Sequence, residues 1–504
     1  MFIKFLVNKF SSKRFQKIDY FKKNPHTVQE ETLFELINLA KNTEFGKRFG
    51  FDSIRDVEYY RTRLPLQTYE DIKPYVDRMR NGEQNILWHS EIKWFAKSSG
   101  TTENKSKLIP VSKEALKSCH FRGGYDILAY YAKDNPETKI FTSKTLTLGG
   151  SHQIDKFENN SRFGDLSAIL IENMPFWANM ARTPSTKVAL LADFDEKLEK
   201  IAKYSIKKNV VAFAGVPSWN MVLMKHILKV TGKKNILEIW PNMELFIHGG
   251  VNFEPYREQY KKLFPTPNMC YLETYNASEG FFALQDDPSR DDMLLMLDYG
   301  IFYEFIPVEE LVKEFPESVG LDQVEMNRNY AVAITTNSGL WRYMIGDTVV
   351  FTSLDPFKIK ISGRTKQYIN VFGEELIVDN AEKALKMACI TTNAIISEYT
   401  AGPVYMTGKQ NGAHEWLIEF EKEPEDLSQF TENLDKALCS VNSDYEAKRS
   451  KNITLRMPIV KSMPKGAFYS WMKKRGKFGG QNKVPRLSND RRYLDEITNS
   501  KYAC

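Results

Sequence analysis

Cysteine is scarce in this 504-residue chain, and its few residues are far apart. The five positions are Cys119, Cys270, Cys389, Cys439 and Cys504. No two of them have the spacing of a metal site, and an odd number of distant cysteines does not suggest a disulfide framework. The sequence therefore excludes a small disulfide-stapled module, and we expect a reducing, cytoplasmic setting.

Long apolar runs are also missing. No stretch approaches the roughly 18 uncharged apolar residues that a membrane-spanning helix needs. The apolar run at residues 3–7 is broken by Lys4 and is too short for the core of a signal peptide. We expect an amphipathic surface helix at this end and no stable association with a membrane.

The net charge of +6 results from a cancellation between regions. Residues 1–25 carry a net +6, and residues 448–486 carry twelve Lys/Arg and no acid, so that residues 26–447 sum to −12. A basic segment beside an acidic body is compatible with a nucleic-acid binder or with a basic lid over an anionic substrate. Aromatic residues are sparse around the end of this segment, which leaves no platform for stacking single-stranded bases.

Strands and helices alternate through the first part of the chain, which has an ordinary globular composition without internal repeats. Periodicity predicts helices over 26–45, from a candidate N-cap at Ser112 to about 132, and near 219–229. Strands are expected at 91–96, 108–111, 209–214, 244–247 and 269–272. Such alternation is typical of an α/β body.

Between residues 293 and 362 the pattern changes to short apolar runs joined by turn residues, such as YAVAITT and DTVVFTS. This is typical of antiparallel strands in a barrel or curved sheet packed on the body. Helices return after 363–366, at 379–388 and 425–442. We therefore expect a large domain over 1–364 and a small α+β domain over 365–504 that holds the basic segment.

The first segment that suits chemistry is KSSGTTENKSK at 97–107, which lies between two predicted strands. Its hydroxyls, exposed backbone N–H groups and lysines suit a phosphate chain. The order of a Walker A loop is absent, and no helix follows directly. A polar hairpin turn is the alternative.

The second segment, YLETYNASEG at 271–280, runs from a strand into a polar stretch. Tyr275 offers a flat face for a base. Glu279 could hold a divalent cation, because Mg²⁺ binds one or two carboxylates together with phosphate oxygens. A solvated loop beside a core tyrosine is the alternative.

Two later segments complete the set. In WRYMIGD at 341–347, Asp347 could accept hydrogen bonds from both hydroxyls of a ribose, although Gly-Asp is also common in plain turns. Arg364 and Lys366 follow, either at a hinge or as surface charges. GKFGGQNKVPR at 476–486 presents Lys483 from a Gly-rich stretch, with a flexible basic tail as the alternative.

The order and spacing of these segments are more informative than any one of them. The chain resembles the adenylate-forming superfamily, which includes acyl-CoA synthetases and firefly luciferase. Within it, the chain is most similar to the acyl-acid amido synthetase family that conjugates auxin or jasmonate to amino acids. The resemblance covers almost the whole chain and is carried by LPLQTYEDIKPYVDRM at 64–79, SSGTT, YNASEG, RYMIGD and QNKVPR.

The resemblance implies an α/β fold: a large N-terminal adenylate-forming domain with a β-barrel-like part, and a small mobile C-terminal α+β domain that rotates about 363–366. It also implies an ATP-dependent ligase that uses Mg²⁺. A small carboxylic acid would become an acyl-AMP, and an amine, expected to be an amino acid, would then receive the acyl group as an amide. The alternatives are an acyl-CoA ligase and a non-catalytic nucleotide or nucleic-acid binder.

The resemblance further assigns roles to residues. Phosphates are expected on Ser98, Ser99, Gly100, Thr101, Thr102 and Lys107. Contacts to the nucleoside are expected from Tyr275, Ala277, Ser278, Asp347 and Arg364. Glu279 is expected to hold Mg²⁺ and to act in catalysis, and Lys483 is expected to bridge the carboxylate and the α-phosphate.

Two positions depart from the family pattern. Asn104 stands where the phosphate loop usually has a second Gly, and Asn tolerates positive φ better than most residues. Met344 stands at the usual Arg of the third signature, and Arg342 on the same strand face could compensate. The sequence identifies neither the acid nor the amine, and the oligomeric state is not readable from it.

The acyl pocket is the least readable part of the sequence. Its candidate walls are residues 216–219, residues 246–251 and the helix that carries His120 and Arg122. For His120 and His248, ordinary core packing is the expected role.

Overall fold

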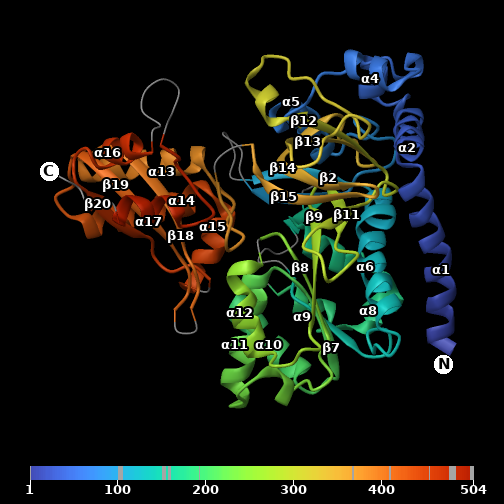
Figure 1. The fold of residues 1–504 in the computed structure, drawn as a ribbon, viewed down its shortest axis with the longest axis horizontal. Helices are drawn as coiled ribbons and strands as arrows, with labels where there is room; N and C mark the ends of the chain where they lie inside the picture. The colour runs from blue at the N-terminus through green and yellow to red at the C-terminus, as the bar shows by residue number, and fades with distance from the viewer. Residues whose placement is uncertain are drawn as a thin grey trace.

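The structure, a computed structural model, describes residues 2–99, 106–149, 155–156, 161–191, 193–251, 253–365, 368–407, 410–452, 454–475 and 484–499. Figure 1 shows a large body, coloured blue to yellow, and a smaller part in orange and red beside it. The chain therefore builds the body first and the smaller part last.

An eleven-stranded sheet forms the centre of the body. Its strands are β3 (Lys144–Thr147), β6 (Arg182–Thr183), β7 (Val210–Gly215), β8 (Leu245–Gly249), β9 (Cys270–Ala277), β10 (Gly280–Leu284), β11 (Met293–Leu295), β12 (Ile301–Pro307), β13 (Asn329–Thr336), β14 (Tyr343–Leu354) and β15 (Phe357–Arg364). Their order is β12-β13-β14-β15-β11-β10-β9-β8-β7-β3-β6. In this spatial order, neighbouring strands from β9 through β8, β7 and β3 to β6 pair in parallel. Neighbouring strands from β12 through β13, β14, β15, β11 and β10 to β9 pair antiparallel.

Helices cover both faces of the parallel strands (Figure 1). One apolar core is shared with α1 (Phe2–Lys23), α2 (Pro25–Ala40) and α6 (Phe121–Asp134). The other is shared with α10 (Phe194–Ser205), α11 (Pro217–Thr231) and α12 (Glu254–Leu263). Burial on both faces explains why β7 reads as an uninterrupted apolar run rather than an alternating one.

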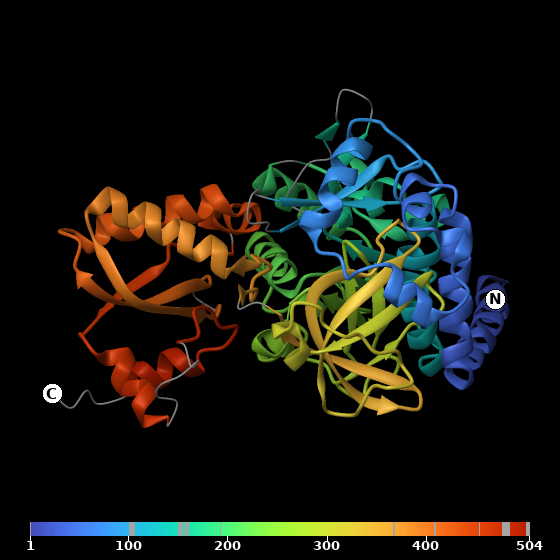
Figure 2. The same ribbon diagram turned by 90° about the horizontal axis from the view of Figure 1, so that it is seen from above.

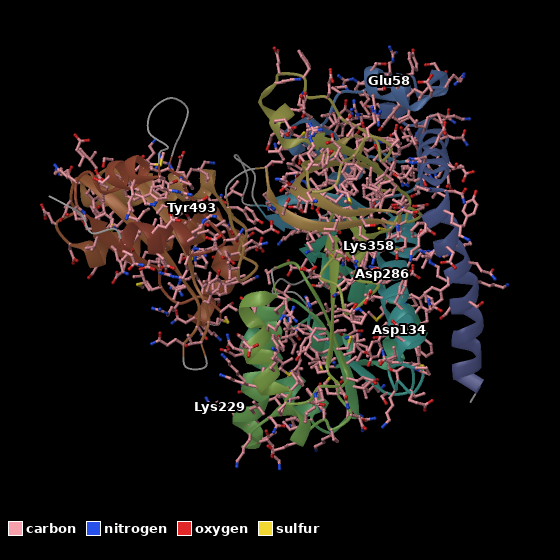
Figure 3. The ribbon with its side chains drawn as sticks, viewed as in Figure 1. Glu58, Asp134, Lys229, Asp286, Lys358 and Tyr493 are labelled. Atoms are coloured by element: carbon pink, nitrogen blue, oxygen red, sulfur yellow. The ribbon has the colours of Figure 1, made fainter. Side chains whose placement is uncertain are left out.

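Hydrogen bonds join the antiparallel strands to the parallel ones through β11, which lies between β15 and β10. Lys358 on β15 reinforces this junction, because its Nζ lies 2.7 Å from Asp286 Oδ1 just after β10. Figure 3 shows these two labelled side chains close together in the middle of the body. The barrel-like part that we expected is thus continuous with the main sheet.

A second, four-stranded sheet has the order β2-β1-β5-β4. Its bounds are β1 (Trp94–Ser99), β2 (Ser106–Val111), β4 (Asp155–Lys156) and β5 (Arg162–Asp165). The hydroxyl of Tyr69, at the start of α5 (Tyr69–Arg80), accepts a hydrogen bond from Leu108 N at 2.9 Å. This bond attaches α5 to the β1–β2 hairpin.

The smaller part is built on the three-stranded sheet β18 (Ile395–Val404), β19 (Ala413–Lys422) and β20 (Ile459–Met463). Figure 2 shows this sheet between two layers of helices. One layer is α13 (Val378–Thr392) and α14 (Leu427–Val441), followed by α15 (Ser443–Arg449). The other layer is α16 (Ala467–Lys474) and α17 (Arg492–Asn499), which share an apolar cluster with Leu417 of β19.

The predicted fold class is confirmed, and most predicted elements have a counterpart. The helix expected at 26–45 is α2 together with the short α3 (Glu44–Arg48). Ser112 caps as predicted, since its Oγ accepts a hydrogen bond from Ala115 N at 2.9 Å, and a π-helical segment Ala115–His120 then leads into α6. The polar loop expected after the strand at 269–272 is instead a two-residue turn between β9 and β10.

Candidate active site

Three residues from three strands of the main sheet form a hydrogen-bonded cluster. Tyr275, near the end of β9, donates from Oη to Asp347 Oδ2 at 2.7 Å. Arg364, at the end of β15, donates from Nε to Asp347 Oδ1 at 2.8 Å. Asp347 and Arg364 are direct neighbours in the β14–β15 register. All three were predicted site residues, and the fold brings them together.

A further carboxylate and an aromatic ring contact Arg364 of this cluster. Arg364 also donates from Nη1 to Glu375 Oε2 at 3.3 Å, and its guanidinium lies 5.1 Å from the ring centroid of Tyr368. Burial alone would lower the pKa of Arg364, but Glu375 and Asp347 raise it well above its ordinary value. Burial raises the pKa of Tyr275 well above its ordinary value, with Asp347 adding to the effect, so Tyr275 remains a donor.

Ser278 and Glu279 form the turn between β9 and β10, where Ala277 pairs with Gly280. Ser278 Oγ donates to Lys97 O at 3.3 Å, which holds the turn beside β1. Burial raises the pKa of Glu279 to about 7; Lys107 opposes the shift, and Asp347 and Glu375 add to it. Glu279 therefore feels the negative charge of two further carboxylates, Asp347 and Glu375, as well as the positive charge of Lys107.

The predicted phosphate-binding segment begins on β1 and ends on β2, which pair with each other. Ser98 pairs with Lys107 and Ser99 with Ser106 in the antiparallel register. Lys107 Nζ lies 5.9 Å from the ring centroid of Tyr69, on the side of the hairpin where α5 begins. The predicted residues Gly100, Thr101 and Thr102 lie outside the described residues, as do Asn104, Lys366 and Lys483.

Arg342 does not take the place of the missing arginine at Met344. β14 begins only at Tyr343, and Arg342 has φ 46°, so the alternation of a strand does not apply to it. Its guanidinium is buried and donates to Glu304 from Nε at 3.0 Å and from Nη2 at 2.9 Å. Met344 packs instead against a small apolar cluster that includes Ala331.

The two histidines considered for the acyl pocket are buried in the core. His120 donates from Nδ1 to Asn276 Oδ1 at 3.0 Å, and burial lowers its pKa to about 4. His248 stacks on Phe253 at 4.2 Å between centroids, and burial, helped by Arg257, lowers its pKa to about 3. Both are neutral at pH 7, as expected for core packing.

Much of the basic segment at 448–486 is paired. Its ion pairs join Arg449 to Asp435, Lys451 to Asp193 and Asp195, Lys461 to Glu415, Arg475 to Glu496, and Arg486 to Glu398. Lys448 Nζ lies 4.6 Å from the ring centroid of Trp219. Among the described residues of this segment, positive charges are therefore interrupted by ion pairs, which weighs against the nucleic-acid interpretation.

Sequence reasoning missed two neighbours of the cluster, Glu375 and Tyr368. They follow Arg364 within residues 365–375, and nothing in their local pattern predicts that both contact the guanidinium of Arg364. Within the part of the chain that the structure describes, no helix is long and apolar enough to cross a membrane.

Three family models match the chain. They describe the GH3 family N-terminal domain over residues 14–269, the GH3 family central domain over 294–364 and the GH3 family C-terminal domain over 379–492. The indole-3-acetic acid-amido synthetase GH3.3 of Arabidopsis thaliana is 23% identical, over 93% of this chain and 90% of that protein. These matches extend over both parts of the molecule.

Solved structures show the same fold. The AtGH3.15 acyl acid amido synthetase in complex with 2,4-DB aligns with a TM-score of 0.64 and 17% identity, over 97% of this chain and 96% of that one. The 2-hydroxyisobutyryl-CoA ligase in complex with 2-HIB-AMP and CoA aligns with a TM-score of 0.57 and 12% identity, over 95% and 93%. A large α/β body with a smaller C-terminal part is common to all three.

Proposed function

The chain belongs to the GH3 family, and on that premise we propose that it is an ATP-dependent acid–amino acid ligase. It converts a small carboxylic acid to an acyl-AMP and then transfers the acyl group to an amine, expected to be an amino acid. Amide formation is favoured over thioester formation because a curated relative matched over nine tenths of the chain is an amido synthetase. The CoA ligase shares the fold at only 12% identity.

The observation that supports this proposal most directly is the cluster of Tyr275, Asp347 and Arg364 beside Glu279. Each oxygen of Asp347 accepts one protein hydrogen bond and retains capacity for a ribose hydroxyl. Tyr275 is held by that carboxylate with its ring against Phe282, 4.8 Å between centroids. In the proposal this ring packs against adenine when the nucleotide binds. Ala277 and Ser278 then follow the nucleoside towards the phosphates.

Phosphate binding is assigned to the β1–β2 hairpin. Ser98 and Ser99 end β1, and Lys107 lies opposite Ser98 on β2, so that a cation and backbone N–H groups line the approach to Glu279. Gly100, Thr101 and Thr102 complete this loop in the proposal.

The donor set at Glu279 fits a magnesium ion that arrives with the nucleotide. The described residues contain no group of three or more His, Cys, Asp or Glu side chains that could hold a metal ion. Mg²⁺ suits a site with one or two carboxylates completed by phosphate oxygens. When bound, the ion would offset negative charge on the phosphates as the acid attacks.

Lys483 is the proposed catalytic cation. A carboxylate attacking a polyanion needs positive charge placed between the two, and a preorganised donor meets that need at the transition state. Residues 1–364 would form the ATP- and acid-binding domain and 365–504 the lid that carries Lys483. Rotation at Arg364 would exchange the adenylation and transfer arrangements.

ATP–pyrophosphate exchange across a panel of carboxylic acids tests the first half-reaction. Exchange that depends on one acid class is expected, whereas exchange that is equally fast without any acid would overturn the proposal. Mass analysis of products formed with mixed amino acids and coenzyme A then tests the acceptor. An amide is expected, and a CoA thioester as the sole product would replace the amide-forming function.

The Lys483→Ala variant tests the assignment of the catalytic lysine. Its exchange rate should fall by roughly 10²–10³, the usual loss for one preorganised group, with ATP binding changed less. Lys461→Ala is the matched control from the same basic segment, because Lys461 is paired with Glu415. Exchange by Lys483→Ala within a few-fold of the control would show that Lys483 is not the catalytic lysine.

A further inference from the structure

Tyr343, the first residue of β14, has a fully buried side chain whose Oη finds no hydrogen-bond partner among the described residues. Leaving a buried hydroxyl unpaired is unfavourable, since the group has lost its water and gained nothing in return. None of the roles assigned above uses this hydroxyl, although Asp347 lies on the same strand.

Backbone pairing places Tyr343 where the start of α5 meets the phosphate hairpin. Gln67 N donates to Arg342 O at 2.9 Å, and Met344 N donates to Gln67 O at 2.8 Å, so residue 67 lies directly beside Tyr343. Two residues later, Tyr69 accepts its bond from Leu108 N. Tyr343 therefore lies beside the segment that leads into α5, and α5 is attached to β2 two residues further on.

The Glu279 turn reaches the same place from the other side. Ser278 is bound to Lys97 O on β1, the strand that pairs with β2. Burial raises the pKa of the Tyr343 hydroxyl well above its ordinary value, and Glu279 contributes most among the neighbouring groups. The hydroxyl thus keeps its proton beside a carboxylate to which it makes no hydrogen bond in the free protein.

We propose that Tyr343 is a positioning residue: its hydroxyl donates a hydrogen bond to the Glu279 carboxylate when ATP and its cation occupy the site. Glu279 is half-buried in the two-residue turn between β9 and β10, so its carboxylate is not fixed inside a strand. The inference rests on the proposed function, because it concerns the same nucleotide site.

A neutral donor suits this task better than another cation. A hydrogen bond to a charged acceptor is stronger than one between neutral groups and has a preferred direction. It would fix the orientation of the carboxylate without cancelling the charge that attracts the metal ion. Because the Tyr343 hydroxyl is unpaired in the free protein and paired in the complex, the new hydrogen bond favours binding of the nucleotide with its ion.

Tyr343→Phe tests this inference, because it removes one oxygen and leaves the ring in place. We expect acid-dependent ATP–pyrophosphate exchange to fall about tenfold or more at low Mg²⁺. The Mg²⁺ concentration for half-maximal exchange should rise by a similar factor. The free variant should be as stable as the wild type or more stable, since an unpaired buried hydroxyl has been removed.

Tyr271→Phe is the matched control. Its hydroxyl is also buried without a hydrogen-bond partner among the described residues, but its ring packs against Phe253 in the other core. This variant should leave both the exchange rate and the Mg²⁺ requirement unchanged.

A double-mutant cycle with Glu279→Gln gives the sharpest readout. If Tyr343 acts through Glu279, adding Tyr343→Phe to Glu279→Gln should cause no further loss of exchange. Unchanged exchange in Tyr343→Phe, a loss without a change in Mg²⁺ requirement, a clear loss of stability, or additivity in the cycle would each overturn the inference. Absence of acid-dependent exchange in the wild type would instead overturn the proposed function.

Discussion

Two clusters in different parts of the molecule contain the same three residue types around one aspartate. In each, a tyrosine hydroxyl and an arginine guanidinium donate to one aspartate. We call them the site cluster and the helix cluster: Tyr275, Asp347 and Arg364 in the first, and Tyr445, Asp435 and Arg449 in the second.

The helix cluster is closed. Its residues lie on the consecutive helices α14 and α15, within 14 positions of one another. Arg449 donates to both oxygens of Asp435 at 2.6 Å, and its Nη1 donates to Asn452 Oδ1 at 2.6 Å and Leu455 O at 3.0 Å. These bonds involve all three guanidinium nitrogens. We therefore infer that the cluster has a structural role and stabilises the packing of α14 and α15.

The site cluster is open. Its residues come from three strands, and its neighbours Glu279, Glu375 and Lys107 add charges of both signs around one buried centre. Charge that exceeds what local pairing requires is typical of a ligand site. The comparison teaches that residue types alone do not separate the helix cluster from the proposed nucleotide site, whereas the surrounding charge does.

The largest effect is expected when the closed cluster loses its cation. Arg449→Met leaves Asp435 buried without a counter-charge, and breaking such a pair costs about 3–5 kcal/mol. Urea denaturation followed by tryptophan fluorescence should show this loss, while exchange at 25 °C stays within a few-fold of wild type. An unchanged unfolding midpoint would mean that the helix cluster does not stabilise the smaller part.

Acid should weaken the protein beside the site cluster, where His120 is bound to Asn276. Burial holds the pKa of folded His120 at about 4, below its ordinary value of 6.5. Between these two pH values the unfolded chain binds a proton that the folded protein does not, so stability is complete above pH 6.5 and falls as the pH approaches 4. The loss should reach at most about 3 kcal/mol.

The matched variant for this pH effect is His120→Asn, which keeps a donor towards Asn276 but does not titrate. The pH dependence of its unfolding free energy between pH 7 and 4 should be shallower than that of the wild type. Parallel pH curves for the two proteins would show that protonation of His120 does not weaken the fold.

The open cluster should respond in activity rather than in stability. Asp347→Asn keeps the shape but removes the charge, and a hydrogen bond to a charged group contributes about 1.5–3 kcal/mol. The kcat/KM for ATP should therefore fall roughly 10- to 100-fold, with an unfolding free energy within about 1 kcal/mol of wild type. Asp435→Asn is its control and should show the opposite pattern.

The comparison also marks how far the sequence could predict the structure. The sequence predicts Tyr275, Asp347 and Arg364 as site residues because the motifs that contain them stand in the order and spacing of the adenylate-forming superfamily. The contact of Glu375 with Arg364 could not be found, because it depends on how the chain turns after β15. The prediction that Arg342 compensates for Met344 was wrong, because Arg342 has a positive φ and does not follow the alternation of the strand.

The smallest effect is expected at a third arginine, which matches Arg449 in hydrogen bonds but not in burial. Arg78 makes four hydrogen bonds to Glu44 and Glu83, as many as Arg449 makes to its partners. Its side chain is 41% exposed, however, against 11% for Arg449. Salt therefore screens its ion pairs, and water takes the place of the lost hydrogen bonds when they break. Arg78→Met should shift neither the urea midpoint nor the exchange rate, and a shift as large as that of Arg449→Met would show that bond number outweighs burial in this protein.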